Sequence, residues 1–438
     1  MNGNKKKRSS GSDDSSNDPD DQKKKKPCSA ESHKQSSVLE AAAGLYEAAR
    51  KIWLCPGENL DYEIVVKKKL RKCIHILEND HVNMDEDEDA QFSLHTQAND
   101  ALTLLCIQKS AYKPKEVYRL LRNAGYIARL SQEVLRYQIP FSSTNNSMEL
   151  GSQLSDTSCP CRVYDEALSK ANLDILIQAL CPEKASYWKD HDYSVHPPSP
   201  YFSYVFNLED DTLQQLGALG QHVSTVLRLS SQLNIIDVEK PCYAEIWAHH
   251  RPHCSGHQLH YDSDNEGRGE VCHPLVSSIL YLSDSGCGGP SLMTDQKLGD
   301  TDLAQNGWFA FPKRNRLCVF DGSVLHGVIP GRGYVRNRKR VSLMVALWKR
   351  IRIREGNEPG AARPLPTIAP LPKWYESLSM KGDQVDPILQ GTNSSTKELE
   401  HAPIEVQPAK IERVFSTISG ETYDEEQMPD YERVFQGF

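Results

Sequence analysis

The sequence lacks any long apolar run. None of its 438 residues lies in a stretch that approaches the roughly 18 consecutive apolar residues of a transmembrane helix, so we expect no association with a membrane. The first residues, Met1-Asn-Gly-Asn-Lys-Lys-Lys-Arg8, lead into Ser and Asp rather than into an apolar segment, which argues against a secretory signal. With 38% hydrophobic and 25% charged residues, the chain is expected to be globular with polar additions.

A repeating cysteine pattern is also missing. The 12 cysteines are scattered, and the closest pair, Cys159-Pro-Cys161, is weak support for a metal or redox role on its own. We therefore expect reduced thiols and a nuclear or cytoplasmic location. No CxxC or HxxxH pair has a matching partner pair, which disfavours a structural zinc site. The side chains that leave zinc open as an alternative are His249, His250, His253, Cys254, His257, Cys272 and His273.

Aromatic residues are absent from positions 1–37, where Lys, Ser and Asp predominate, and this composition predicts a disordered tail. Its basic clusters, Lys5-Lys6-Lys7-Arg8 and Lys23 through Lys26, are as consistent with a nuclear-localisation signal as with a solubilising tail. In 38–140, apolar residues recur at steps of three and four, which predicts a helical accessory segment. Residues 141–158 have the composition of a linker.

The last part of the chain, 356–438, is Pro-rich and polar, and we expect it to be largely irregular. It contains a short echo, Glu412-Arg-Val-Phe415 and Glu432-Arg-Val-Phe435. Two copies of four residues are compatible with a docking motif, but the interpretation as a chance echo is favoured.

The chemistry-bearing residues lie between these parts, in 159–355. Two helices are expected there, over 164–179 and 212–233, and short strands follow, separated by Gly, Pro and Asp. Because no helices intervene between them, the strands suit a sandwich or jelly roll better than a βαβ fold. The predicted fold is a mainly β catalytic domain, a double-stranded β-helix (jelly roll) with its core at about 240–350, flanking helices and an N-terminal α-helical segment. The expected strands are 243–248, 275–282, 291–294, 307–311, 316–320, 324–328 and 341–348.

Within this strand-rich part, His260-Tyr-Asp262 is followed by Leu325-His326-Gly327. Side chains at i and i+2 of a strand share a face, so His260 and Asp262 can reach one ion together. With His326 from a neighbouring strand, they would form a set of two imidazoles and one carboxylate. That set leaves about half of an octahedron open, as in non-haem Fe(II) oxygenases. Asp264 would replace Asp262 only if the loop were shifted by two residues.

Further motifs surround this triad. Arg340-Val-Ser342 opens a late apolar strand, and a guanidinium is suited to bidentate binding of a carboxylate. Tyr281 lies on the strand that follows the HxD motif, where barrel packing is an equally good explanation for an aromatic residue.

At these residues the sequence resembles the 2-oxoglutarate- and Fe(II)-dependent dioxygenases, particularly the prolyl-4-hydroxylase-like branch. The shared motifs cover 240–350, about a quarter of the chain. In order they are HxD, Tyr281-Leu282, Gly288-Gly289, Phe320-Asp-Gly before His326, and Arg340-x-Ser342.

The resemblance implies that His260, Asp262 and His326 bind iron. It implies that Arg340 binds the distal carboxylate of 2-oxoglutarate, assisted by Ser342 and Tyr281. The implied cofactors are Fe(II), 2-oxoglutarate as co-substrate and O2, with ascorbate as an optional addition. One departure is that Arg340 lies fourteen positions after His326, a longer spacing than is usual in the family, which leaves Arg336 and Arg338 as rivals.

The implied activity is hydroxylation of a substrate, with succinate and CO2 as co-products. By its family branch, the substrate would be a protein side chain such as proline. The alternatives are an oxidative demethylase of nucleic acid or protein, and a non-catalytic jelly-roll scaffold that binds partners.

One segment stands out by its charge. Positions 313–355 carry twelve Lys and Arg against Asp321 and Glu355, a net of +10, while the whole chain has a net charge of −8. This segment would attract an acidic protein or a nucleic acid. Pairing with carboxylates of the same chain is the slightly favoured alternative. Oligomeric state is not predicted.

Overall fold

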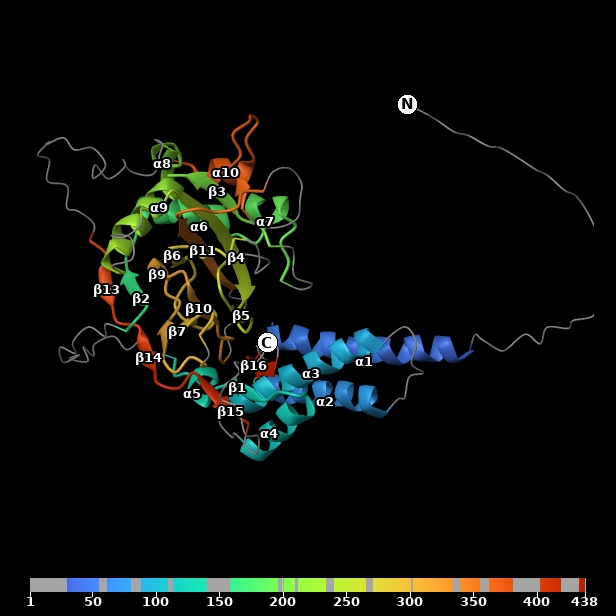
Figure 1. Ribbon diagram of the computed structural model, residues 1–438. Coiled ribbons are helices and arrows are strands. Elements are labelled where there is room, and N and C mark those ends of the chain that lie inside the picture. The colour runs from blue at the N-terminus through green and yellow to red at the C-terminus, as the bar shows by residue number, and fades with distance from the viewer. Residues whose placement is uncertain are drawn as a thin grey trace, which may run out of the picture.

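Two facing β-sheets occupy the centre of the computed structural model, with helices on both outer sides (Figure 1). The structure describes residues 30–54, 61–79, 88–108, 113–139, 158–195, 199, 201–208, 212–233, 240–264, 271–300, 302–333, 339–354, 362–380, 402–418 and 433–437. No helix within these ranges is long and apolar enough to cross a membrane.

The larger sheet has the strand order β12-β3-β4-β11-β6-β9-β2-β13, and the smaller one β14-β8-β7-β10-β5. A third, small sheet has the order β15-β1-β16. The strands are β1 Ala128–Leu130, β2 Cys161–Asp165, β3 Tyr204–Asn207, β4 Tyr243–Pro252, β5 His257–His260, β6 Val276–Tyr281, β7 Ser291–Lys297, β8 Gly307–Ala310, β9 Arg316–Asp321, β10 Val324–Val328, β11 Lys339–Trp348, β12 Arg363–Pro364, β13 Ile404–Val406, β14 Ala409–Ile411, β15 Phe415–Thr417 and β16 Val434–Phe435.

From β4 to β11 the chain passes back and forth between the two sheets. Strands β4, β6, β9 and β11 lie in the larger sheet, and β5, β7, β8 and β10 in the smaller one, with antiparallel pairing throughout. This arrangement fits the jelly roll expected from the sequence. All seven expected strands are confirmed, with small shifts at their ends.

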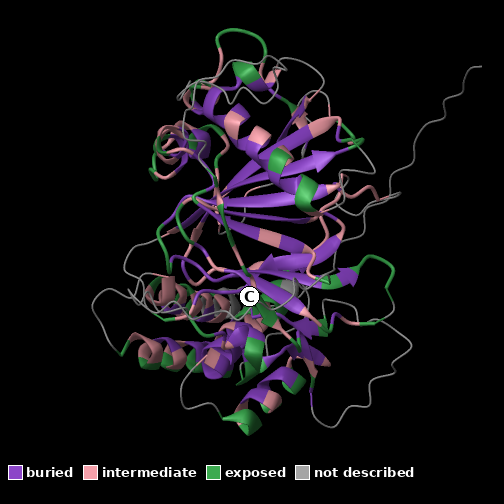
Figure 2. Cartoon of the chain, turned by 90° about the vertical axis from the view of Figure 1, so that its left-hand side faces the viewer, coloured by how far each residue is buried: buried purple, intermediate pink, exposed green. Residues whose placement is uncertain are grey.

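Strand β11 explains how the larger sheet buries both of its faces. Val341, Leu343, Val345 and Leu347 belong to an apolar core shared with helices α6, α7, α9 and α10, which cover the outer face. The alternate residues face the space between the two sheets, where Met344 packs with side chains from both. The central strands of both sheets are accordingly almost wholly buried (Figure 2), whereas the edge strands β12, β13 and β14 are largely exposed. The helices are α1 Ala30–Leu54, α2 Tyr62–Asn79, α3 Glu88–Gln108, α4 Pro114–Asn123, α5 Gln132–Leu135, α6 Lys170–Leu180, α7 Ser186–Asp190, α8 Thr212–Gln215, α9 Gly217–Ser230 and α10 Lys373–Leu378, with a 3-10 turn η1 at Ser231–Leu233.

The helical accessory segment packs directly on the outer face of the smaller sheet. One apolar core joins Leu104 and Leu121 of this segment to Leu292, Phe309 and Leu325 of the sheet. Helix α1 begins at Ala30, so the expected tail is helical from there onward. The two basic clusters of the tail lie outside the described residues.

The beginning of the first helix in the barrel region was predicted wrongly. Residues 161–165 form β2, which pairs with β9, rather than the first turn of a helix. All residues of β2 except Arg162 are buried between its neighbours, and the helix begins only after Ser169, which caps α6 by accepting a hydrogen bond from the backbone nitrogen of Asn172. The second expected helix is interrupted between α8 and α9 by Leu216.

The expectation of a largely irregular segment after position 355 is corrected for its described residues. Strands β13 and β14 extend the larger and the smaller sheet at their edges. Strands β15 and β16 flank β1 on its two sides, and each contains the Phe of one ERVF copy. Phe415 and Phe435 are both buried, so both ERVF copies dock within the chain, β15 antiparallel and β16 parallel to β1.

Candidate metal centre

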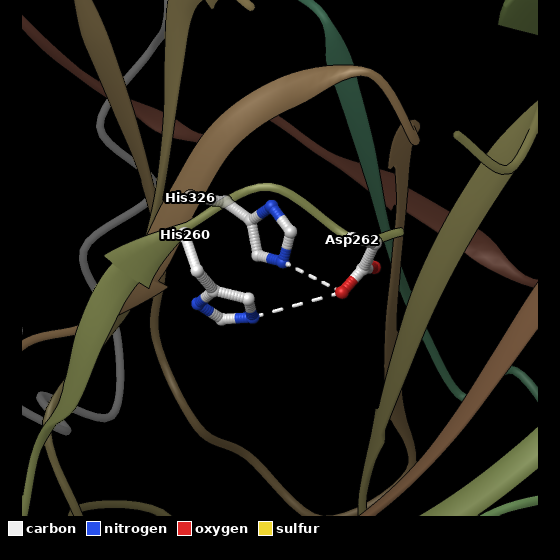
Figure 3. A group of neighbouring side chains, drawn as sticks. All are labelled: His260, Asp262 and His326. Carbon is white, nitrogen blue, oxygen red and sulfur yellow. Dashed lines mark ion pairs between the residues drawn. The ribbon is translucent and has the colours of Figure 1, made fainter. Parts of the chain in front are cut away.

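Two neighbouring strands of the smaller sheet bring the three predicted ligands together. His260 ends β5, His326 lies in the middle of β10, and the two residues face each other across the antiparallel pair. Asp262 follows β5 by two residues, in a loop rather than in the strand. All three side chains point into the space between the sheets (Figure 3).

The donor atoms of this triad converge. One ligand atom from each residue lies within 4.8 Å of the other two. The Nε2 atoms of His260 and His326 are each 3.6 Å from Oδ1 of Asp262. Ligands at bond lengths of about 2.1 Å on adjacent octahedral corners are about 3 Å apart, so a small inward movement closes the triad around one ion.

Both imidazoles are oriented with Nε2 free for a metal. Nδ1 of His260 donates to the carbonyl of Gln258 at 2.8 Å, and Nδ1 of His326 donates to the carbonyl of Val324 at 3.0 Å. Because a carbonyl only accepts hydrogen bonds, the proton of each neutral ring is on Nδ1, which leaves the Nε2 lone pair toward Asp262. Metal-ligating histidines have this kind of support.

The carboxylate of Asp262 is held in a similar way. Its Oδ2 accepts a hydrogen bond of 2.6 Å from the hydroxyl of Ser277, and its Oδ1 faces the imidazoles. Burial alone would raise the pKa of Asp262, but the imidazoles of His326 and His260, when protonated, outweigh this effect and hold the pKa well below its ordinary value, and a cation bound at their Nε2 atoms would act in the same direction. The carboxyl group is therefore ionised, and its charge attracts a cation to the point where the three donors meet.

The same cavity contains the residues predicted to bind a carboxylate. Arg340, 3% exposed, and Ser342 line it together with the triad. The guanidinium of Arg340 lies over the ring of Tyr281 at 5.3 Å and donates to the hydroxyl of Ser291 at 3.0 Å. Nε of Arg340 and Oγ of Ser342 are buried without any hydrogen-bond partner. A buried guanidinium and a buried hydroxyl in this state fit a bound carboxylate, which accepts from both.

Tyr281 is fully buried, and it contacts Arg340 on the side of the guanidinium that faces its ring. Its hydroxyl hydrogen-bonds to Ser291 at 2.8 Å and to the carbonyl of Ala310 at 3.1 Å. The phenol is thus engaged within the barrel, and its ring carries the guanidinium of Arg340.

The glycine turn before β7 makes room for Arg340. Gly288 has a φ of +82°, and a Cβ there would lie 2.5 Å from Cδ of Arg340. Gly289 packs against the backbone of Ile329, since a Cβ there would lie 1.8 Å from its carbonyl oxygen. Both glycines are needed for close approach of the chain rather than for a ligand.

The sequence alternatives are distributed as follows. Arg336 and Arg338 lie outside the described residues. Asp264 is not part of the triad and accepts a hydrogen bond from the backbone nitrogen of Cys272. Within the described part of the chain, the triad is the one group of three His, Cys, Asp or Glu side chains that converges on a point. The zinc alternative therefore has no support there.

Several residues of the cavity were missed from the sequence. Trp247, His249 and His257 line it, and Ser277 and Ser291 hold the two predicted anionic and cationic groups. A usable signal existed for Ser277, because it shares the two-residue period of β6 with Tyr281 and so lies on the same face. Burial lowers the pKa of His249 and His257 well below the ordinary value, and nearby cationic side chains add to this effect. Both rings are therefore neutral near pH 7.

The basic segment forms several ion pairs with carboxylates of the barrel region. Lys313 and Arg316 both pair with Asp165, each at 2.6 Å. Arg314 pairs with Asp284, and Lys339 with Glu183. At these positions the charge is balanced within the same region of the chain.

No protein-family model matches the sequence, and no curated protein matches it. Solved structures with some similarity include a prolyl-4-hydroxylase from Pseudomonas putida, with a TM-score of 0.28 and 17% identity over 44% of this chain and 89% of that one. EvdO2 from Micromonospora carbonacea var. aurantiaca has a TM-score of 0.29 and 11% identity, over 43% of this chain and 86% of that one. HygX from Streptomyces hygroscopicus, with nickel and 2-oxoglutarate bound, has a TM-score of 0.22 and 10% identity, over 43% of this chain and 82% of that one. TM-scores this low do not establish what this chain does.

Proposed function

We propose that the chain is an Fe(II)- and 2-oxoglutarate-dependent dioxygenase with a jelly-roll barrel. One observation carries this proposal. A two-histidine, one-carboxylate triad shares a cavity with a buried guanidinium and hydroxyl that have unused hydrogen-bonding capacity. The first feature suits a divalent ion with open coordination positions, and the second suits the distal carboxylate of a dicarboxylate co-substrate.

In this proposal His260, Asp262 and His326 hold Fe(II), and Arg340 with Ser342 holds the distal carboxylate of 2-oxoglutarate. When bound, the iron and co-substrate supply O2 activation, which couples decarboxylation of 2-oxoglutarate to hydroxylation of a substrate. The protein contributes fixed imidazole tautomers, an ionised carboxylate and a cationic anchor for the co-substrate. The substrate proposed is a protein side chain such as proline, on the resemblance of the motifs to the prolyl-4-hydroxylase-like branch.

The direct test of the activity is succinate release by the purified protein with Fe(II), 2-oxoglutarate, O2 and ascorbate. Succinate should form, and its formation should disappear when Asp262 is replaced by Ala. A chain that binds Fe(II) but forms no succinate under any condition would be better described as a binding scaffold.

A further inference from the structure

The second ERVF copy places a polar side chain against the strand that carries a proposed iron ligand. Strand β5 lies at the edge of the smaller sheet, and β10 is its one strand neighbour among the described residues. On its other edge, the backbone N–H of Leu259 donates to Oε1 of Gln436 at 2.7 Å. Both residues are buried, at 7% and 8% exposure, so water does not compete for this bond.

The N–H of Leu259 and the carbonyl of Gln258 belong to the same peptide group. That carbonyl accepts the hydrogen bond from Nδ1 of His260 at 2.8 Å. Because a peptide group is planar and rigid, fixing the direction of its N–H also fixes the direction of its C=O. Hydrogen bonds in such a chain also polarise one another. The amide of Gln436 is thereby connected through one peptide group to the imidazole of His260.

The two histidines of the triad differ in how their backbone is held. His326 lies in β10, which is paired on both sides, with β5 and with β7. His260 lies at the end of β5, whose pairing with β10 consists of two residue pairs with a register shift between them. The peptide group that orients His260 is therefore secured by Gln436 in place of a second neighbouring strand.

We propose that Gln436 is a positioning residue for the metal ligand His260. It fixes the peptide group between Gln258 and Leu259, and this group in turn fixes the direction and tautomer of the imidazole. This inference rests on the proposed function, because it assigns His260 to a metal. The segment around Gln436, which is 176 residues away from His260 in the sequence, is then part of the metal centre rather than an appendage to the fold.

The test compares metal affinity in two variants that lose packing or bonding in equivalent segments. Gln436→Ala removes the acceptor for Leu259. Phe415→Leu trims the buried Phe of the other ERVF copy, which docks on β1 from the opposite side and makes no bond to β5. Co(II) and anaerobic Fe(II) titrations give the dissociation constants, thermal melts give the loss of stability, and hydrogen exchange reports on the Leu259 amide.

Partners of metal-ligating histidines contribute about 10- to 100-fold to metal affinity, and Gln436 acts one hydrogen bond further out. We expect Gln436→Ala to weaken metal binding about 10-fold and to speed exchange at Leu259, while Phe415→Leu changes metal binding less than about twofold. Equal metal affinity in wild type and Gln436→Ala, with His260→Ala abolishing binding, would overturn the inference while leaving the triad intact. If the wild-type chain binds no metal, the proposed function fails instead, and with it the role of Gln436 toward a ligand.

Discussion

Replacement of Arg340 by Ala tests the co-substrate half of the proposed site. The side chain is 3% exposed, stacks on Tyr281 and has a buried Nε without a hydrogen-bond partner. A carboxylate bound there gains charge-assisted hydrogen bonds from a guanidinium that is almost completely buried. Their loss should cost on the order of 2–4 kcal/mol, or about 30- to 1000-fold in affinity for 2-oxoglutarate.

The assay is the Michaelis constant for 2-oxoglutarate in succinate formation, measured beside the dissociation constant for Fe(II). Arg340→Ala should raise the first greatly and leave the second nearly unchanged. Arg314→Ala is the matched control, because this arginine belongs to the same basic segment but is half exposed and pairs with Asp284. It should change the Michaelis constant by less than about threefold.

Two outcomes would refute the assignment of Arg340. A large effect of Arg338→Ala or Arg336→Ala, with Arg340→Ala close to wild type, would transfer the role to one of the other two arginines. If all three variants keep the wild-type Michaelis constant for 2-oxoglutarate, the assignment of 2-oxoglutarate as co-substrate fails, even if iron is bound.

Three further predictions concern Ser277, Gly288 and Asp100. Ser277→Ala should weaken Fe(II) binding about 10-fold in an anaerobic titration, because it removes the hydrogen-bond donor to Asp262. The control Ser278→Ala loses only a hydrogen bond to the carbonyl of Val345 and should leave Fe(II) affinity unchanged. Equal losses of Fe(II) affinity in the two variants would contradict the role of Ser277. Gly288→Ala should raise the Michaelis constant for 2-oxoglutarate, because the added Cβ would crowd the side chain of Arg340. The control Gly286→Ala has a similar φ of +79° but open space around it, and should cost only about 1 kcal/mol of stability. An unchanged Michaelis constant in Gly288→Ala would contradict the idea that the Cβ displaces Arg340. Burial raises the pKa of Asp100 to about 7 although Tyr126 donates a hydrogen bond to it, so the stability it contributes is complete below about pH 4 and is lost as the pH rises through 7. Denaturation of the wild type should show a free energy of unfolding about 4 kcal/mol lower at pH 8 than at pH 4, and Asp100→Asn should lack this decrease. An identical decrease in both proteins would show that Asp100 is not responsible for it.

The sequence allowed the barrel strands to be predicted because most of them are apolar, β-branched and bounded by Gly, Pro or Asp. Strand β5 was missed because His257-Gln-Leu-His260 contains only one apolar residue, Leu259, and no β-branched residue, and because it is held mainly by its neighbour β10 and by Gln436. The late strands were missed for a related reason. Strands such as β13 and β15 are only three residues long, and their partners β2 and β1 are more than 200 positions away in the sequence.

The candidate ligands His260, Asp262 and His326 could be chosen from the sequence because HxD and a distant His are recognisable as residue types in order. The groups that prepare them for a metal could not. The carbonyls of Gln258 and Val324 belong to the backbone, so their role depends on local conformation rather than on residue type. Gln436 is brought to β5 by folding alone, and nothing in the sequence near position 436 indicates a metal centre.

The central claim is tested most directly by anaerobic calorimetric titration of the purified metal-free chain, first with Fe(II) and then with 2-oxoglutarate. The proposed site predicts one Fe(II) per chain, 2-oxoglutarate binding that requires the metal, and loss of both in Asp262→Ala. Fe(II) binding of equal strength in wild type and Asp262→Ala would contradict it.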